Sequence, residues 1–302
     1  MSTRTIAVIG ATGHQGGGVV TALLSSSSSS FTVRALTRDP KSASAQSLTG
    51  RHAEAVADGR LQLVQADLDD EKSLVEALKG VSGVFAAFSD SLDQAAYGKR
   101  LVNAVKAVGN PHFVYSTLPS ITKLSSGKLS DGYVYDPKAE VAEYTRKQLT
   151  TFTFVVAGVF YSNLADELYA RRNAEGVVEF RLPIKPSTVQ HWVDDCHDIG
   201  VYTAAIFNAP PSLVNGKTYP VASAPLTMAE IAVEYEEATG EKAVAVERSQ
   251  DEALADYMDS IPKDWSLGYG LFSPANDPAW EDLGVKASTI GDFVRRSGFR
   301  VQ

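Results

Sequence analysis

Residues 133–144, YVYDPKAEVAEY, place a lysine close to two tyrosines. A lysine ammonium lowers the pKa of a nearby phenol, and such a tyrosine can protonate a carbonyl oxygen during hydride transfer. The usual spacing for this pair sets the tyrosine four residues before the lysine. Val134 holds that position here, with Tyr133 and Tyr135 on either side of it and Lys138 following. We therefore expect Lys138 to be catalytic. Tyr133, or else Tyr135, could serve as a displaced acid, and packing of both tyrosines is the alternative.

The segment IAVIGATGHQGGGVV has glycines at the spacing G-x-x-G-x-x-G, between a strand pattern and a helix pattern. Gly10 permits a tight turn, Gly13 lets backbone N–H groups approach a pyrophosphate, and Gly16 lets the helix pack on the strand. The amino end of the helix adds a partial positive charge that favours phosphates. A glycine-rich turn without a ligand is the alternative. The motif predicts dinucleotide contacts from Gly10, Ala11, Thr12, Gly13, His14, Gln15 and Gly16.

The second strand pattern ends in ALTRDPKS, at the point where folds of this kind recognise the adenine ribose of a cofactor. Arg38 can form a bidentate contact with a 2′-phosphate, and Lys41 follows closely. A carboxylate would instead accept hydrogen bonds from the ribose hydroxyls, and Asp39 is available for that role. Arg38 as the phosphate ligand favours NADP(H) over NAD(H), and a solvated surface arginine is the alternative.

The third and fourth strand patterns also end in residues that suit a nucleotide. Asp67, in LVQADLDD, could bond the adenine edge or could cap the following helix. The fourth pattern, VFAAFS, contains small residues that would let the backbone pass close to the cofactor. We therefore add Asp67, Ala87 and Phe88 to the expected cofactor contacts.

Six short apolar segments alternate with helix-period segments in the first half of the chain: RTIAVIG, FTVRALTR, LQLVQAD, SGVFAAFS, HFVYST and TFTFVVAG. Such runs are typical of buried parallel strands, so the alternation predicts an α/β fold with a Rossmann-type doubly wound parallel sheet. We expect residues 1–160 to form the dinucleotide-binding core. VVEFRL, TVQHWVD and KTYPVAS indicate short strands of a smaller α+β lobe. We assign residues 161–302 mainly to this lobe, with some segments returning to the core.

The composition of the 302-residue chain narrows the class of protein. A formal net charge of −8 disfavours direct binding to nucleic acid, whose backbone attracts basic surfaces. The first residues lack the apolar core of a signal peptide, and no stretch approaches the roughly 18 apolar residues of a membrane span. One cysteine, Cys196, excludes an internal disulfide framework. We therefore expect a cytoplasmic protein without membrane contact.

The segment DDCHDIG, residues 194–200, gathers residue types that can ligate metals. Its spacing does not match a structural zinc site, which needs separated pairs of ligands. Carboxylates here also suit the start of a helix over IGVYTAAIF, and Cys196 suits a small buried side chain. We therefore expect no metal at this segment.

Taken in order, several motifs resemble the NmrA-like branch of the atypical short-chain dehydrogenases: GATGHQGGGV, RALTRDP, VFAAFS, FVYST, the lysine ahead of VAEY, AGVFYSNL and DDCHDIG. Two late segments, GKTYPVASAPLTMAEIA and LGVKASTIGDFVRR, are similar to the carboxyl-terminal lobe of that family. The resemblance implies a Rossmann-type domain that binds NADP(H). It also implies that Lys138 holds the nicotinamide ribose, that Phe160 and Asn163 lie beside the cofactor, and that Phe160 and Tyr161 line the substrate side.

The family contains two classes of protein, and the missing tyrosine leaves both open. Some members are reductases that keep the lysine and lack the ordinary tyrosine. Others are sensors or transcriptional co-regulators that bind the dinucleotide without turnover. We expect an NADPH-dependent reductase or dehydrogenase that acts on a small aromatic or cyclic organic substrate. The alternative is a redox sensor that binds a protein partner such as a transcription factor, which would also bring it into the nucleus.

Overall fold

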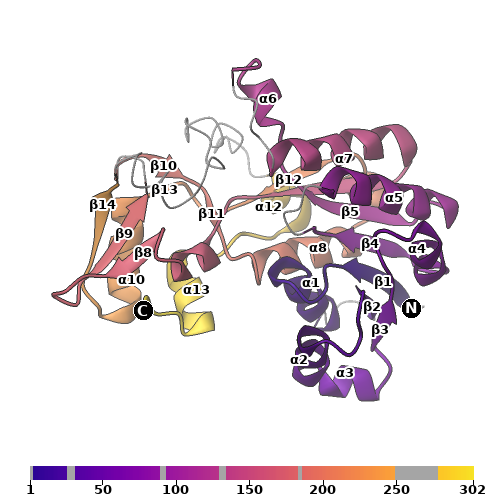
Figure 1. Cartoon of the computed structure of the whole chain (residues 1–302), viewed down its shortest axis with the longest axis horizontal. Helices are drawn as coiled ribbons and strands as arrows, with labels where there is room; N and C mark the ends of the chain where they lie inside the picture. The colour runs from indigo at the N-terminus through magenta and orange to yellow at the C-terminus, as the bar shows by residue number, and fades with distance from the viewer. Residues whose placement is uncertain (1–2, 26–30, 89–92, 129–133, 183–185, 249–277) are drawn as a thin grey trace.

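A seven-stranded parallel sheet forms the larger part of the molecule in the computed structural model (Figure 1), which describes residues 3–25, 31–88, 93–128, 134–182, 186–248 and 278–302. The strand order is β12-β6-β5-β4-β1-β2-β3. Because β1 pairs with both β2 and β4, the chain winds outward from the centre in both directions. This confirms the doubly wound Rossmann-type sheet. The strands are β1 (Arg4–Ile9), β2 (Phe31–Thr37), β3 (Leu61–Gln65), β4 (Gly83–Ala86), β5 (His112–Thr117), β6 (Phe152–Ala157) and β12 (Thr218–Val221).

Six of these strands are the six predicted from the apolar segments, and the seventh corrects a prediction. β12 comes from KTYPVAS, which we expected in the smaller lobe, but it pairs in parallel with β6 at the edge of the main sheet. TVQHWVD forms two short strands with different partners, β10 (Val189–Gln190) and β11 (Trp192–Val193). An apolar alternation shows that a segment is extended, but it does not show which sheet the segment joins.

Helices cover both faces of the main sheet, and each face has its own apolar core. Along β1, Ile6 and Val8 belong to one core while Ala7 and Ile9 belong to the other, as the two-residue period of a strand requires. One core includes residues of α1 (His14–Ser25), α2 (Ala43–Arg51), α3 (Ala53–Ala57), α8 (Asp198–Asn208), α9 (Pro211–Val214) and α12 (Pro278–Leu283). The other includes residues of α4 (Glu71–Leu78), α5 (Gln94–Ala107) and α7 (Tyr135–Gln148), and the short α6 (Ile121–Leu124) precedes α7.

Two glycines bring α1 and α8 into backbone contact. A Cβ on Gly18 would lie 2.2 Å from the carbonyl oxygen of Cys196, and a Cβ on Gly200 would lie 2.3 Å from the carbonyl oxygen of Gly18. No side chain larger than hydrogen fits at either position without a shift of the backbone. The close contact places the turn before α8 directly beside the start of α1, although the two segments lie far apart in the sequence.

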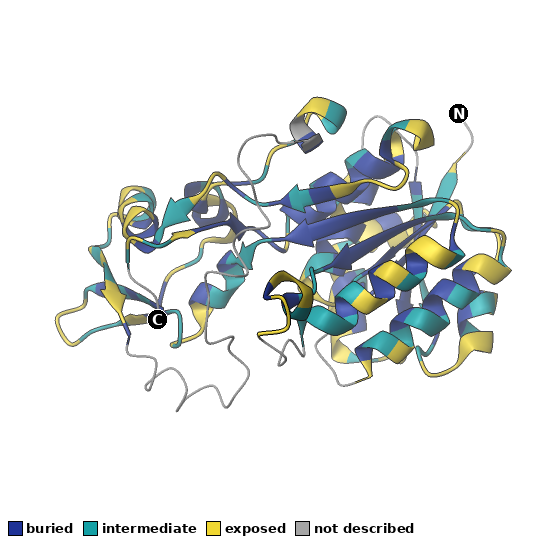
Figure 2. Cartoon of the chain, turned by 90° about the horizontal axis from the view of Figure 1, so that it is seen from above, coloured by how far each residue is buried: buried dark blue, intermediate teal, exposed yellow. Residues whose placement is uncertain are grey.

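The smaller lobe is α+β, as predicted, and has a separate core (Figure 2). β9 (Val178–Leu182) pairs antiparallel with β8 (Ala170–Arg172) and parallel with β14 (Ala243–Glu247). α10 (Met228–Thr239) and α13 (Ile290–Ser297) contribute apolar residues to this core, and each begins with a capping box. The segment between the sheet and the lobe contains β7 (Val159–Phe160) and the 3-10 helix η1 (Tyr161–Ala165), and β13 (Leu226–Thr227) precedes α10. None of the described helices has the length and apolar character needed to cross a membrane.

Candidate functional site

A cavity of about 910 Å³ lies along the carboxyl ends of the strands of the main sheet. Doubly wound sheets bind their ligands at this edge, where the strand order reverses. Most of the residues predicted to contact the cofactor line the cavity: Gly10, Thr12, Gly13, His14, Gln15, Gly16, Arg38, Asp67, Ala87, Phe88, Lys138 and Phe160. Ala11 lies behind the loop, fully buried in the core under α1.

The turn between β1 and α1 leaves no room for side chains where the chain folds back. Gly10 has a φ of +75°, and a Cβ there would lie 2.4 Å from the carbonyl oxygen of Ala87. A Cβ on Gly16 would lie 2.1 Å from the carbonyl oxygen of Gly10. Gly13 is exposed, and a Cβ there would meet that same oxygen at 3.4 Å. Gly10 and Gly16 therefore shape the turn, while Gly13 keeps its outer surface open.

The amino end of α1 presents backbone N–H groups that have no acceptor within the helix. His14, Gln15 and Gly16 form this first turn and line the cavity. The free amides and the helix dipole suit an anion, and the absence of a Cβ on Gly13 lets that anion approach the backbone. The turn thus fits the diphosphate group of a dinucleotide.

Arg38 and Asp39, the two alternatives for contact with the adenine ribose or its 2′-phosphate, both line the cavity just after β2. The Asp39 carboxylate accepts a hydrogen bond from the backbone N–H of Lys41 at 2.8 Å and is engaged in its own turn. Arg38 is exposed and is long enough to form a fork with a phosphate. This arrangement favours the Arg38 alternative over the Asp39 alternative.

Asp67 follows β3 and lines the cavity, but it does not cap α4. The carboxylate of Asp70 caps that helix, because it accepts from the N–H groups of Lys72 and Ser73. Asp67 instead accepts from the N–H of Asp69 at 3.0 Å. The helix-cap alternative for Asp67 is therefore wrong, and a contact with the nucleotide remains a prediction.

Lys138 lies in the first turn of α7 and is only 8% exposed. Its carbonyl oxygen accepts a hydrogen bond from the hydroxyl of Thr117 at 3.0 Å, which joins the start of α7 to the end of β5. Val134, at the position that a Tyr-x-x-x-Lys pair gives to tyrosine, lines the cavity. Tyr135 does not line it, and Tyr133 lies outside the described residues. The ordinary tyrosine position therefore offers a branched apolar side chain to the ligand.

The predicted role of Tyr161 on the substrate side is wrong, because the side chain is fully buried in the core of the smaller lobe. Its ring stacks on Trp192 at 5.8 Å and on Phe293 at 5.5 Å between centroids. Burial raises the pKa of this phenol far above its usual range. Asn163 lies in η1 and does not line the cavity either, so Phe160 alone of the three residues reaches it. The family resemblance placed the segment correctly but not the direction of each side chain.

Sequence reasoning missed several polar residues of the cavity, and Ser116, Thr117 and Asp195 are among them. The hydroxyl of Ser116 donates to Oε1 of Gln15 at 2.6 Å. Both Ser116 and Thr117 end β5, so their place at the carboxyl end of a parallel strand was a usable signal. Asp195 gave no such signal, because it reaches the cavity only through the contact of α8 with α1.

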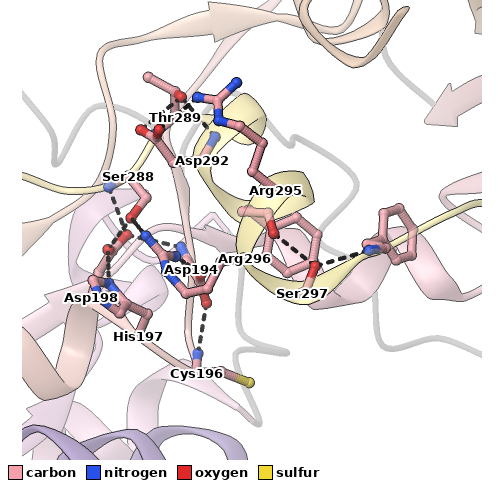
Figure 3. A network of polar contacts seen from close by, with 12 residues as sticks. Asp194, Cys196, His197, Asp198, Ser288, Thr289, Asp292, Arg295, Arg296 and Ser297 are labelled. Carbon is pink, nitrogen blue, oxygen red and sulfur yellow. Dashed lines mark hydrogen bonds and ion pairs between the residues drawn. The ribbon is translucent and has the colours of Figure 1, made fainter. Parts of the chain in front are cut away.

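The DDCHDIG segment forms the turn before α8 and the first three residues of that helix, and residues 288–296 bind two of its carboxylates (Figure 3). Asp194 pairs with Arg296 of α13. Asp198 accepts from the N–H and the hydroxyl of Ser288, at 2.9 Å and 2.6 Å. Burial, reinforced by the charge of Asp198, raises the pKa of Asp194. The turn is therefore fixed to the segment that leads into the last helix of the lobe.

Cys196 is exposed, so the prediction of a buried side chain is wrong. Desolvation of its sulfur, followed by the charges of Asp195 and Asp194, raises the pKa of the thiol to about 12. His14, Asp195 and Cys196 place possible ligand atoms within 4.8 Å of one another. The spacing of DDCHDIG could not reveal this group, because His14 comes from the other end of the chain.

Comparison with known proteins gives matches over most of the chain. A model of the NmrA-like family matches residues 2–267. An NmrA-like family domain-containing oxidoreductase of Aspergillus hancockii is 31% identical over 263 residues, which cover 80% of this chain and 74% of that protein. The nitrogen metabolite repression protein nmrA of Emericella nidulans is 30% identical over 223 residues, which cover 70% of this chain and 59% of that protein.

Solved structures share the fold over nearly the whole length. NmrA, a negative transcriptional regulator solved in complex with NAD, matches with a TM-score of 0.70 at 24% identity, covering 99% of this chain and 93% of that one. An NADPH-dependent quinone oxidoreductase from Escherichia coli, solved in complex with NADPH, matches with a TM-score of 0.70 at 22% identity. That match covers 97% of this chain and 100% of the other. At these identities the likeness establishes the fold.

Proposed function

The chain belongs to the NmrA-like family, and from this premise we propose that it binds NADP(H) and reduces a small aromatic or cyclic organic substrate. The observation that carries the proposal is one continuous cavity lined by the glycine turn, by Arg38 and by Lys138. The first two features suit a phosphorylated dinucleotide, and the third suits chemistry on its nicotinamide. The relatives named as oxidoreductases and the neighbour solved with NADPH support the same reading.

The cofactor would lie with its diphosphate on the amino end of α1 and its 2′-phosphate on Arg38. Backbone amides and an arginine fork both favour phosphate over neutral groups. Asp67 and Tyr97 line the cavity and would lie beside the adenine. The dinucleotide would therefore follow the carboxyl edge of the sheet from β3 toward β5.

Lys138 would carry the chemistry on the nicotinamide side. When bound, the nicotinamide ring supplies the hydride. A lysine at the start of α7 can donate to the ribose hydroxyls and can stabilise negative charge that develops on a substrate oxygen. Leu118, Val134 and Phe160 line the same cavity with apolar surface, which suits a flat aromatic or cyclic substrate.

The test is consumption of NADPH by the wild-type protein with a panel of aromatic ketones, enones and quinones, followed through the absorbance of the reduced cofactor. Calorimetry on the same preparation measures NADPH binding. We expect tight binding and turnover of at least one substrate class. Tight binding without turnover across the panel would reject the reductase, and no binding would reject the dinucleotide site itself.

A redox sensor that binds a protein partner is the second candidate. Val134 at the ordinary tyrosine position favours it, and so does the similarity to a nitrogen metabolite repression protein. In that function NADP(H) would change the affinity for the partner and would stay unconsumed. Both candidates act in the cytoplasm, and the sensor would also enter the nucleus. Two results together would support the sensor. The protein would turn over no substrate of the panel, and its affinity for a protein partner would differ between the NADP⁺ and NADPH forms.

A further inference from the structure

We propose that His14, Asp195 and Cys196 form a binding site for a divalent cation of the zinc type. One ligand atom of each, a ring nitrogen, a carboxylate oxygen and the thiol sulfur, lie within 4.8 Å of one another. His14 begins α1, whereas Asp195 and Cys196 belong to the turn before α8. The expectation of no metal rested on the spacing within DDCHDIG, whereas this group needs a histidine from the other end of the chain.

The three side chains are close to the geometry that such an ion requires. Nδ1 of His14 lies 2.9 Å from Oδ2 of Asp195. Around a tetrahedral zinc, with bonds of about 2.0–2.3 Å, nitrogen and oxygen ligands are about 3.3 Å apart, so this contact need open by only a few tenths of an ångström. His14 and Cys196 are both exposed, which leaves their side chains room for that adjustment.

The carboxylate of Asp195 gives independent evidence for a cation at this place. Its side chain is 0% exposed, and its Oδ1 atom has no hydrogen-bond partner among the described residues. A buried carboxylate oxygen without a partner costs free energy, and a cation bound to the carboxylate would offset that cost. The ring of His14, itself exposed, is the only group that forms an ion pair with Asp195 in the described parts of the chain.

The other two carboxylates of the turn are already occupied, so they do not compete for the ion. Asp194 pairs with Arg296, and Asp198 accepts from Ser288. Figure 3 shows that the sulfur of Cys196 points away from this network. The turn therefore separates its side chains into a group that holds the lobe and a group that faces His14.

The kinds of ligand atom select the kind of ion. Zinc binds imidazole nitrogen, carboxylate oxygen and thiolate sulfur in tetrahedral sites, whereas magnesium and calcium take oxygen ligands. Three protein ligands leave the fourth tetrahedral position to water, as in zinc sites that stay open. Because His14 and Asp195 line the cavity, we expect this open position to face it.

The charges at the site also suit a doubly charged ion. Desolvation, and after it the charges of Asp195 and Asp194, raise the pKa of the Cys196 thiol. Those same negative charges attract a divalent cation. When the ion binds, the S–H bond breaks, the sulfur–metal bond forms, and the proton leaves to solvent. The thiolate and the Asp195 carboxylate then balance the two positive charges, with the imidazole neutral.

The experiment is titration of the full chain, freed of metal and carrying no affinity tag, with Co²⁺ as a spectroscopic probe and then with Zn²⁺ as competitor. We expect the absorption of thiolate-to-cobalt charge transfer, with one ion per chain, and its loss when zinc displaces cobalt. The chain has one cysteine, so this band can arise only from Cys196. Zinc should bind with a Kd of about 1 μM or below, and excess Mg²⁺ should not compete.

Four variants test the ligands one at a time. Cys196→Ser should abolish the charge-transfer band. His14→Gln and Asp195→Asn should each weaken zinc binding by at least about a hundredfold, the upper end of the loss seen for residues outside the ligand set. His197→Gln is the matched control, since this histidine lies in the same turn but contacts Asp198, and it should bind zinc as the wild type does. Circular dichroism identifies any variant that fails to fold.

No charge-transfer band with the folded wild type would overturn the inference. Zinc affinity unchanged in Cys196→Ser or in Asp195→Asn would also overturn it, because the ion would then lie elsewhere. An equal loss in His197→Gln and His14→Gln would do the same. The dinucleotide takes no part in these measurements, so their failure leaves the proposed function standing, and a failure of NADPH to bind leaves this inference standing.

Discussion

Two walls of the same cavity are built in opposite ways. The glycine wall, residues 9–16, is one continuous stretch whose shape comes from backbone contacts such as that of Gly10 with Ala87. The lysine wall, formed by Leu118, Val134, Lys138 and Phe160, is assembled from separate segments and offers side chains. A wall formed by backbone atoms tolerates few substitutions and binds one kind of ligand. A wall made of side chains can change its chemistry while the first wall keeps its ligand.

This contrast accounts for two classes of protein on one scaffold. The matches include proteins named as oxidoreductases and a protein named for nitrogen metabolite repression. A backbone site for the dinucleotide would serve both, because a negative transcriptional regulator was solved with NAD and a quinone oxidoreductase was solved with NADPH. The position of Val134 lies on the lysine wall, where a catalyst and a sensor would differ. Substitutions in one wall test whether the property that belongs to the other wall, cofactor binding or turnover, also changes.

The largest effect is expected on the glycine wall, from Gly13→Val. The new side chain would occupy the outer surface of the turn, so NADPH affinity should fall by more than about a hundredfold, since several amide contacts are lost together. The fold should survive, because the Cβ would meet only the Gly10 carbonyl oxygen, at 3.4 Å. The measurement is thermal shift with added NADPH, because a ligand that binds the native state raises the melting temperature.

Gly50→Val in α2 is the matched control, because a Cβ there meets nothing within 4 Å. It should keep the full NADPH-induced shift. Gly16→Val should instead lower the melting temperature without any ligand, since its Cβ would lie 2.1 Å from the Gly10 carbonyl oxygen. If NADPH stabilised the Gly13→Val protein as strongly as the wild type, this turn would not be part of the cofactor site.

The glycine wall was also the part that the sequence predicted well, and the reason is physical. The turn, its strand and its helix are contiguous, so the spacing of Gly10, Gly13 and Gly16 describes a local backbone shape. The six strands of the core were predictable for the same reason, since a buried parallel strand is a short apolar run. β12 was assigned to the wrong sheet because its partner β6 lies some sixty residues earlier, as the register Thr218–Phe154 shows.

The lysine wall was predicted less well, because side-chain directions there depend on packing between distant segments. Tyr161 follows Phe160 directly, yet its ring points into the core of the lobe and stacks on Trp192 and Phe293. Asp195 enters the cavity because Gly18 and Gly200 let two helices touch. Neither fact can be read from spacing, since both depend on which surfaces meet in the folded chain.

The second effect belongs to the lysine wall. Lys138→Met keeps the length of the side chain and removes its charge and donors, so any reductase rate should fall by roughly a hundredfold or more, the usual scale for a general acid or its electrostatic support. NADPH binding should weaken only modestly, because the diphosphate and 2′-phosphate contacts are unchanged. The measurement is the rate of NADPH consumption at saturating substrate.

Lys147→Met, on the exposed end of α7, is the control and should keep the wild-type rate. Tyr133→Phe and Tyr135→Phe should each cost far less than Lys138→Met. A tyrosine variant as inactive as Lys138→Met would show that a displaced tyrosine–lysine pair operates here after all.

A smaller effect is expected from Arg38→Ala, which removes a charged contact and leaves the turn intact. NADPH affinity should fall about tenfold or more, the scale of about 1.5–3 kcal/mol for a charge-assisted hydrogen bond. NADH affinity should change little, because NADH lacks the 2′-phosphate. Calorimetry with both cofactors measures the ratio, and Lys41→Ala, outside the cavity lining, is the control. If Arg38→Ala kept the wild-type ratio of NADPH affinity to NADH affinity, Asp39 would be the residue that contacts the adenine ribose.

The smallest and most informative effect concerns two neighbours at the end of β5, one joined to each wall. The Ser116 hydroxyl donates to Gln15 on the glycine wall at 2.6 Å, and the Thr117 hydroxyl donates to the carbonyl oxygen of Lys138 at 3.0 Å. One such hydrogen bond is worth about 1 kcal/mol, or about fivefold. Ser116→Ala should therefore weaken NADPH binding about fivefold with little change in the turnover rate, whereas Thr117→Val should lower the rate about fivefold with little change in binding. Calorimetry and steady-state rates on both variants measure the two effects. If the two variants altered binding and rate alike, β5 would transmit each change to both walls, and their separation into a binding wall and a chemical wall would be wrong.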